Sequence, residues 1–173
     1  MLLQTDRLVL RDLVEDDWIA VHAYLNDPRF LATAQASPMP ELSSYSFVRQ
    51  WLPWGDGPRG CFLLAVVLAD KGLLVGTCGI TRAGWDEGKK VGWLGYEITP
   101  WHWGKGFATE AARAVIGFGF EELGLDRISG DTLTINKGSV RVMRKLGMWR
   151  DTRRNTGRWA VYSIRGDEWL NCA

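Results

Sequence analysis

The chain has 173 residues, of which 46% are hydrophobic and 24% charged, and 21 basic against 20 acidic side chains give a formal net charge of +1. This length and composition indicate a single globular domain over residues 1–173 and exclude a disordered or fibrous chain. The near-neutral charge argues against a protein dedicated to binding nucleic acid or a membrane surface.

The amino-terminal segment and the cysteines bear on the compartment and on metal binding. Asp6, Arg7 and Arg11 interrupt the first apolar residues, so neither a signal peptide nor a membrane-spanning helix is predicted there. The three cysteines and two histidines lack the spacing of a zinc site, and no metal is expected. We therefore expect a cytoplasmic protein.

Hydrophobic periodicity in the first hundred residues predicts a strand, two helices and an antiparallel meander of three strands. The expected elements are a strand at 6–11, a helix from Asp16 or Asp17 to the stop at Asn26-Asp27-Pro28, a short helix from Ser43 or Ser44, and strands at 62–68, 73–81 and 91–99.

The second part of the chain alternates helices and strands. The expected elements are a helix at 109–123 closed by Gly124, a strand at 128–133, a helix at 139–146, and a hairpin whose turn at Asn155-Thr156-Gly157 leads into a strand at 159–164. This mixed order predicts an α+β fold with a central, mostly antiparallel mixed sheet and helices on both faces.

A glycine-rich turn separates the last strand of the meander from the long helix. Gly104 and Gly106 stand directly before the helix start, where backbone N–H groups are unpaired and carry partial positive charge. With Lys105 between them, these residues can form a cradle for a pyrophosphate. The spacing is not GxGxxG and the preceding strand belongs to a meander, so a dinucleotide-binding fold is disfavoured, and a plain strand-to-helix turn is the alternative.

Four ordered motifs resemble the GNAT acyltransferases, and within them the branch of RimJ/RimL-like ribosomal-protein N-terminal acetyltransferases. The motifs are TDRLVLR at 5–11, LVGTCGI at 74–80, GYEI at 95–98 with WGKGFATEA at 103–111, and NKGSVRVMRKLGM at 136–148. The resemblance covers nearly the whole chain. It implies a single GNAT-like domain that transfers acetyl from acetyl-CoA directly to an amine.

The resemblance also implies which residues bind the cofactor. Trp101 stands where the superfamily often has Gln or Arg, a change that is tolerable because backbone N–H groups hold most of the phosphate. The implied acetyl-CoA contacts are Ile98, Trp103, Gly104, Lys105, Gly106, Phe107, Ala108, Thr109, Asn136 and Ser139.

Three residues are candidates for catalysis if the resemblance holds. Ser139 could protonate the departing thiolate, or it could be only the cap of the helix that it begins. Glu97 could accept the ammonium proton directly or through water, or it could face solvent. Asn136 could bond the pantetheine amides or a substrate carbonyl, or it could simply turn the loop.

The chain contains ten tryptophans, and their positions indicate where the acetyl acceptor could bind. Trp51, Trp54 and Trp85 could wall the acceptor cleft, whereas Trp18, Trp93 and Trp159 are expected in the core. The acceptor is expected to be a protein N-terminus or a small-molecule amine, and a homodimer is possible. The alternatives are a catalytically silent CoA-binding sensor or assembly module, and an aromatic-rich module that binds carbohydrate or peptide.

Overall fold

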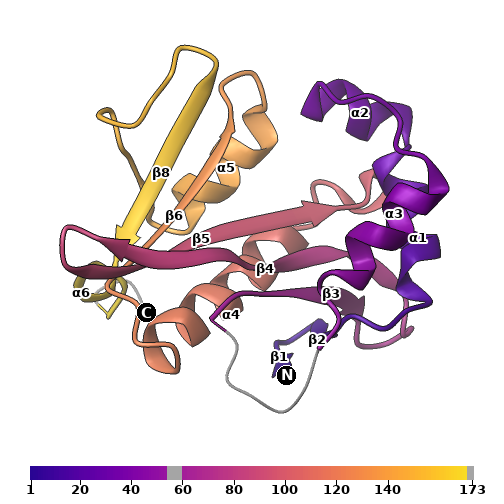
Figure 1. Cartoon of the computed structure of the whole chain (residues 1–173), viewed down its shortest axis with the longest axis horizontal. Helices are drawn as coiled ribbons and strands as arrows, with labels where there is room; N and C mark the ends of the chain where they lie inside the picture. The colour runs from indigo at the N-terminus through magenta and orange to yellow at the C-terminus, as the bar shows by residue number, and fades with distance from the viewer. Residues whose placement is uncertain (54–59, 171–173) are drawn as a thin grey trace.

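The central sheet organises the molecule and contains the strands that surround the site. In the computed structural model, which describes residues 1–53 and 60–170, eight strands pair in the order β1-β2-β3-β4-β5-β6-β8-β7 (Figure 1). Every neighbouring pair is antiparallel except β5 and β6, which are parallel. The strands are β1 (Leu2–Gln4), β2 (Leu8–Asp12), β3 (Phe62–Leu68), β4 (Leu74–Asp86), β5 (Lys89–Ile98), β6 (Arg127–Leu133), β7 (Trp149–Arg150) and β8 (Trp159–Arg165).

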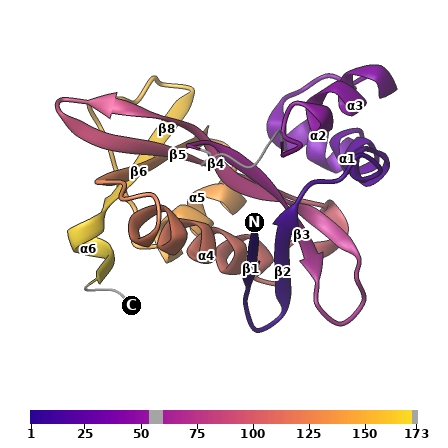
Figure 2. The same cartoon turned by 60° about the horizontal axis from the view of Figure 1, so that its bottom comes forward.

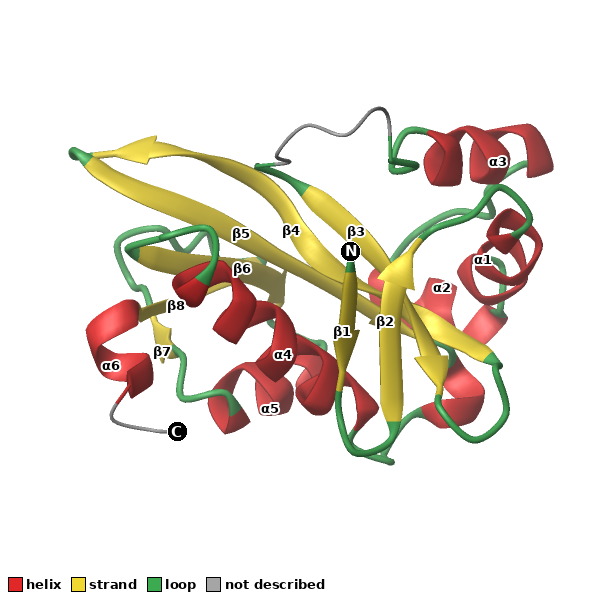
Figure 3. Ribbon diagram, turned by 90° about the horizontal axis from the view of Figure 1, so that it is seen from below, coloured by secondary structure: helices red, strands yellow, loops and turns green. Residues whose placement is uncertain are grey.

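Helices cover both faces of the sheet, as the order of elements predicts. Figures 2 and 3 show α1 and α3 over the amino-terminal strands and α4 across the opposite face. No helix among residues 1–53 and 60–170 is long and apolar enough to span a membrane. The helices are α1 (Asp17–Leu25), α2 (Pro28–Ala34), α3 (Glu41–Arg49), the 3-10 turn η1 (Pro100–His102), α4 (Phe107–Glu121), α5 (Lys137–Lys145) and α6 (Gly166–Leu170).

Strand β3 separates two hydrophobic cores. All seven of its residues are buried, and because side chains alternate along a strand, each face supplies a different core. Leu64 and Val66 join the larger core under α4, while Leu63 and Ala65 join a smaller one under α1 and α3. The apolar run at 62–68 is therefore buried on both faces instead of alternating with polar residues.

Some expectations need correction. Asn26-Asp27-Pro28 ends α1 as expected but also starts the unpredicted helix α2, because Asp27 caps it by accepting from Arg29 N. The final turn is confirmed, since Thr156 N donates to Trp159 O at 3.1 Å and Trp159 N to Thr156 O at 2.7 Å, but the connection from β7 to β8 is longer than this turn, because β7 comprises only Trp149 and Arg150. Trp159 was expected in the core, but it is 41% exposed because it begins β8 at the edge of that connection.

Strands β5 and β6 diverge after a short contact, and this divergence creates the site (Figure 1). Only Val91 to Trp93 pair with β6, whereas β6 pairs with β8 along its entire length. Met143 of α5 packs against Gly130 at the point of divergence, where a Cβ on Gly130 would lie 2.9 Å from Met143 Cε. Residues 94–98 of β5 therefore pair with β4 on one side and, within the described part of the chain, have no partner strand on the other.

Candidate active site

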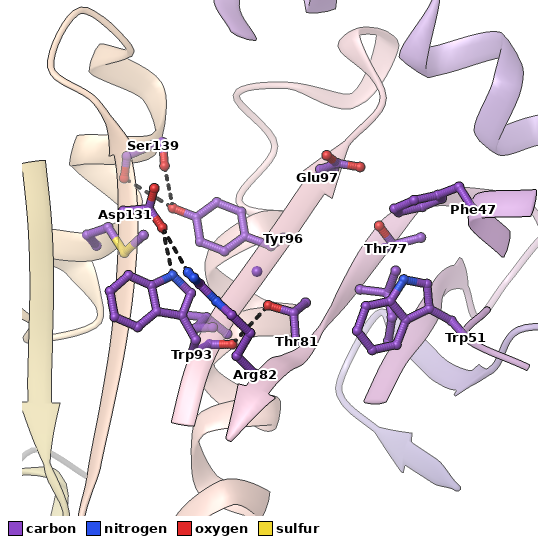
Figure 4. A pocket seen from close by; sticks show the side chains of 14 residues that line it. Phe47, Trp51, Thr77, Thr81, Arg82, Trp93, Tyr96, Glu97, Asp131 and Ser139 are labelled. Carbon is purple, nitrogen blue, oxygen red and sulfur yellow. Dashed lines mark hydrogen bonds and ion pairs between the residues drawn. The ribbon is translucent and has the colours of Figure 1, made fainter. Parts of the chain in front are cut away.

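A cleft of about 350 Å³ lies where β5 and β6 diverge. In Figure 4 its aromatic wall, Phe47 and Trp51, lies opposite Ser139 and Asp131, with Tyr96 between them. The side chains come from α3 and the segment after it, β3, β4, β5, β6 and α5, so the cleft depends on the assembled fold. The lining residues are Phe47, Trp51, Leu63, Thr77, Thr81, Arg82, Trp93, Leu94, Gly95, Tyr96, Glu97, Asp131, Ser139 and Met143.

The glycine-rich turn leads from β5 into the first turn of α4. Gly104 and Gly106 have φ values of +78° and +87°, which non-glycine residues rarely adopt, and Gly106 is the N-cap of α4. A Cβ on Gly104 would meet nothing within 4 Å, so this part of the turn opens outward. The first N–H groups of a helix have no partner inside it, and neither Gly104 nor Gly106 adds a side chain to the turn that precedes them. This arrangement fits a pyrophosphate.

Hydrogen bonds made by Trp103, and by Glu110 with Arg7, hold the glycine-rich turn in place. Trp103 Nε1 donates to Ile98 O at 2.6 Å, so the implied contacts Ile98 and Trp103 also brace the turn. Glu110, one turn into α4, accepts from Thr5 Oγ1 at 2.6 Å and from Arg7 N at 3.0 Å and Nε at 2.7 Å. Arg7 in turn donates to Lys105 O at 3.1 Å. The segment before β2 therefore fixes the turn from the far end of the sequence.

Ser139 meets a tyrosine hydroxyl in the cleft. Its Oγ lies 2.7 Å from the Tyr96 hydroxyl, so the two form a hydrogen-bonded pair. Burial raises the pKa of Tyr96 above its ordinary value, and the hydrogen bond with Ser139 offsets part of that rise. Asn136 is the N-cap of α5 and accepts from Ser139 N at 3.0 Å. The cap is thus Asn136, which leaves the Ser139 hydroxyl available to the cleft.

Glu97 lies in the cleft on the same strand as Tyr96, with its carboxylate turned toward α1. Glu97 Oε2 accepts from the hydroxyl of Tyr24 at 3.0 Å, and that hydroxyl lies 3.2 Å from Thr77 Oγ1. Burial raises the pKa of the Glu97 carboxyl, and the hydrogen bond from Tyr24 reverses part of this shift. A carboxylate held in this way can accept a proton more readily than one in water.

Asp131 adds a second carboxylate at the other side of the cleft. Its Oδ1 accepts from Trp93 Nε1 at 2.6 Å and lies 3.8 Å from Arg82 Nη2. Trp93, expected in the core, is half-buried and lines the cleft because β4 shifts register between Ile80 and Arg82 and brings Arg82 over the Trp93 ring.

The three tryptophans expected at the acceptor end fall in different places. Trp51 lines the cleft, and its Nε1 is buried without a hydrogen-bond partner among residues 1–53 and 60–170. Trp85 lies near the tip of the β4–β5 hairpin, is 74% exposed and is not among the lining residues. Trp54 lies outside the described residues.

Neither histidine adds a metal-binding group. His102 packs beside Phe107, and burial together with the nearby charges of Lys105 and Lys71 lowers its pKa. Within the described part of the chain, no group of three or more His, Cys, Asp or Glu side chains could hold a metal ion.

Comparisons with known proteins agree with the fold. The sequence profile of a family described as an acetyltransferase (GNAT) domain matches residues 7–149. The uncharacterised N-acetyltransferase YnaD of Bacillus subtilis (strain 168) is 30% identical over 169 residues, or 98% of this chain and 92% of YnaD. A GNAT-family acetyltransferase from Bacillus anthracis has a crystal structure with a TM-score of 0.79 at 27% identity, covering 97% of this chain and 100% of that one.

A further structure shares the fold at lower identity. The spermidine N-acetyltransferase from Vibrio cholerae, solved in complex with CoA and spermine, has a TM-score of 0.78 at 18% identity, covering 96% of this chain and 100% of that one. The fold and the profile together define an acetyltransferase. The chain belongs to the GNAT family, whose general reaction is acetyl transfer from acetyl-CoA to an amine.

Proposed function

We propose that this chain transfers acetyl from acetyl-CoA directly to a primary amine, either a protein N-terminus or a small molecule, as a member of the RimJ/RimL-like branch. The observation that carries the proposal is that Glu97 and the Ser139–Tyr96 hydroxyl pair line one cleft beside the glycine-rich turn. Direct transfer needs a group that accepts the ammonium proton and a group that protonates the departing thiolate. The cleft contains groups of both kinds, a carboxylate at Glu97 and the hydroxyl pair.

Glu97 is the proposed base. An amine arrives mostly as an ammonium ion at neutral pH and must lose a proton before its nitrogen can attack the thioester carbonyl. Burial raises the pKa of Glu97, which narrows the gap between the carboxylate and the ammonium and so favours this proton transfer. The hydrogen bond from Tyr24 holds one carboxylate oxygen, and the other is left to meet the acceptor or a water molecule.

The Ser139–Tyr96 pair is the proposed acid. The raised pKa of Tyr96 keeps its hydroxyl protonated at neutral pH, so either member of the pair can pass a proton to the departing sulfur. Tyr96 was not singled out from the sequence. Its partner is 43 residues away along the chain, and only the fold brings the two hydroxyls together.

The glycine-rich turn and the free edge of β5 are the proposed cofactor site. The backbone of 104–108, with Lys105 and Thr109, would hold the pyrophosphate at the start of α4. The edge of β5 at 94–98 that faces away from β4 would pair with the amide groups of the pantetheine arm, in the way that an extended peptide adds to a sheet edge. Asn136 uses its side-chain oxygen as a cap, which leaves its Nδ2 to donate to the same arm.

A thiol-release assay with acetyl-CoA and panels of small amines and N-terminal peptides tests this proposal. We expect Ser139→Ala to lower kcat by roughly 10²-fold with little change in acetyl-CoA affinity. Glu97→Gln should lower the rate most at pH values where the acceptor is an ammonium, and less where free amine predominates. A rate and pH profile equal to those of the parent protein would remove each residue from the mechanism.

A double-mutant cycle separates a shared proton path from two independent roles. If Ser139 and Tyr96 act as one unit, Tyr96→Phe combined with Ser139→Ala should cost no more than the more severe single change. Binding of acetyl-CoA without release of thiol for any amine would instead favour the alternative of a silent CoA-binding module.

A further inference from the structure

A second, smaller cavity adjoins the cleft. It measures about 150 Å³ and is bounded by the β4–β5 hairpin, the start of β6 and the connection before β8. Arg82 and Trp93 line both this cavity and the cleft, so the two adjoin at these side chains. The described side chains that line it include three arginines, Arg82, Arg127 and Arg154, and no acidic residue.

Two of these arginines form ion pairs with carboxylates that are not among the residues lining the cavity. Asp86 forms ion pairs with both Arg127 and Arg154, and Asp151 lies 3.5 Å from Arg154 Nε. These contacts fix the guanidinium groups without using all their donors. Arg127 Nε is buried and has no hydrogen-bond partner among the described residues. A buried N–H of a cation without an acceptor is costly, so the described side chains leave the donors of Arg127 incompletely satisfied.

Arg82 extends from the cleft toward the same cavity. Its guanidinium lies 4.5 Å from the centre of the Trp93 ring, a stacking contact that orients it. Its distance of 3.8 Å from Asp131 exceeds hydrogen-bond length, and 69% of the side chain is exposed. Arg82 therefore retains donors that can bind an anion at the boundary between the cleft and the cavity.

We propose that this arginine-lined cavity binds a negatively charged group of the acceptor, a carboxylate or a phosphate, remote from the amine that is acetylated. The inference rests on the proposed function, because it names the class of acceptor that the same site would take. Guanidinium groups bind both kinds of anion through paired N–H donors. The enzyme would thus prefer amines that also carry an acidic group.

The spacing along β5 sets the separation between the amine and the anion. Glu97 and Trp93 are four residues apart on one strand, a Cα separation of about 13 Å. The long arginine side chains extend from the Trp93 end toward Glu97 and shorten the distance that a ligand must span by several ångströms. An extended peptide advances about 3.3 to 3.6 Å per residue. An acidic side chain on the third residue of a peptide would therefore reach the cavity while the terminal amine is at Glu97.

Three tetrapeptide amides that differ only at the third residue, glutamate, phosphoserine or glutamine, provide the test. Acetylation of each is followed by thiol release and mass spectrometry. We expect kcat/KM for at least one charged peptide to exceed that for the glutamine peptide by about tenfold, as for a charge-assisted hydrogen bond. Which charged peptide is preferred distinguishes carboxylate from phosphate recognition.

Arginine variants connect that preference to the cavity. Arg82→Gln and, separately, Arg154→Gln should reduce the charged-to-neutral ratio of kcat/KM toward one, whereas Arg82→Lys should keep part of it. Arg153→Gln is the matched control, because it removes the same charge from the same connection at a residue that does not line the cavity. Arg82 is largely exposed, so its variants should fold even if Arg154→Gln does not.

The outcomes separate this inference from the proposed function. Equal rates for all three peptides, or an equal fall in the ratio for Arg153→Gln, would overturn the inference while leaving acetyl transfer intact. Turnover of other amines with none of these peptides would also overturn it. Absence of thiol release with every amine would refute the proposed function, and the inference with it.

Discussion

Removing Glu110 should loosen the glycine-rich turn and weaken acetyl-CoA binding together. In Glu110→Ala the hydroxyl of Thr5, the backbone N–H of Arg7 and the Arg7 guanidinium all lose their acceptor. The Arg7 side chain is 51% exposed, so water replaces much of the ion pair, which contributes about 0 to 1 kcal/mol. The backbone N–H of Arg7 also lies in an exposed contact and can bond to water instead, whereas the Thr5 hydroxyl is part-buried, and leaving it unsatisfied costs about 1 to 3 kcal/mol.

The expected loss of unfolding free energy is therefore about 1 to 4 kcal/mol, which lowers Tm by roughly 2 to 4 °C per kcal/mol for a chain of this length. Calorimetry should also show weaker acetyl-CoA binding, since Arg7 no longer holds Lys105 in place. Burial favours protonation of Glu110, but hydrogen bonds from Thr5 and Arg7 lower its pKa overall. Its stabilising effect is thus present above the ordinary carboxyl pKa and is lost as pH falls through the lowered value.

Glu121→Ala is the matched control, because Glu121 is an exposed carboxylate at the far end of the same helix. It should change the unfolding free energy by less than about 0.5 kcal/mol and leave cofactor affinity unchanged. If the two variants were alike in both Tm and acetyl-CoA affinity, the assigned role of Glu110 would be refuted.

Three further changes test the cradle, the buried carboxylate and the aromatic wall. Gly104→Val should weaken acetyl-CoA binding at least tenfold by calorimetry, whereas Gly72→Val, at a similar positive φ and also in open space, should not. Glu97→Gln should raise Tm at neutral pH, because burial destabilises the ionised form of Glu97. The gain in Tm should shrink as pH falls toward the ordinary pKa of a carboxyl group, and an unchanged Tm at neutral pH would contradict the assigned burial. Trp51→Ala should raise the acceptor KM about five- to tenfold with little effect on acetyl-CoA, as for a lost aromatic contact, and Trp85→Ala should leave both unchanged.

Helices and strands with local sequence signals could be predicted from the sequence alone. The hairpins of β3, β4 and β5 and the long helix α4 have apolar runs bounded by turn residues, and the structure confirms them within a few residues. The helix α2 was missed because none of its residues is buried, so it has no apolar periodicity to detect. The dipeptide Asp27-Pro28 both ended one helix and began the next, and only the first role was recognised.

Contacts within the site depend on sheet geometry that sequence patterns do not encode. Alternation along β4 would not place Arg82 beside Trp93, because an irregularity between Ile80 and Arg82 shifts the pairing. The pairing of Tyr96 with Ser139 likewise requires the divergence of β5 from β6. Residue types at the site could therefore be proposed from the sequence, but their partners could not.

The short junction between β5 and β6 has a consequence for the lifetime of the folded chain. Because only residues 91–93 of β5 are paired with β6, a molecule bound along the free edge would join two groups of strands that otherwise share few backbone hydrogen bonds. By mass action such a ligand stabilises the fold by about 2.7 kcal/mol at a hundredfold excess over its Kd. The supply of acetyl-CoA would then set resistance to proteolysis and the slowest amide hydrogen exchange as well as the rate of turnover.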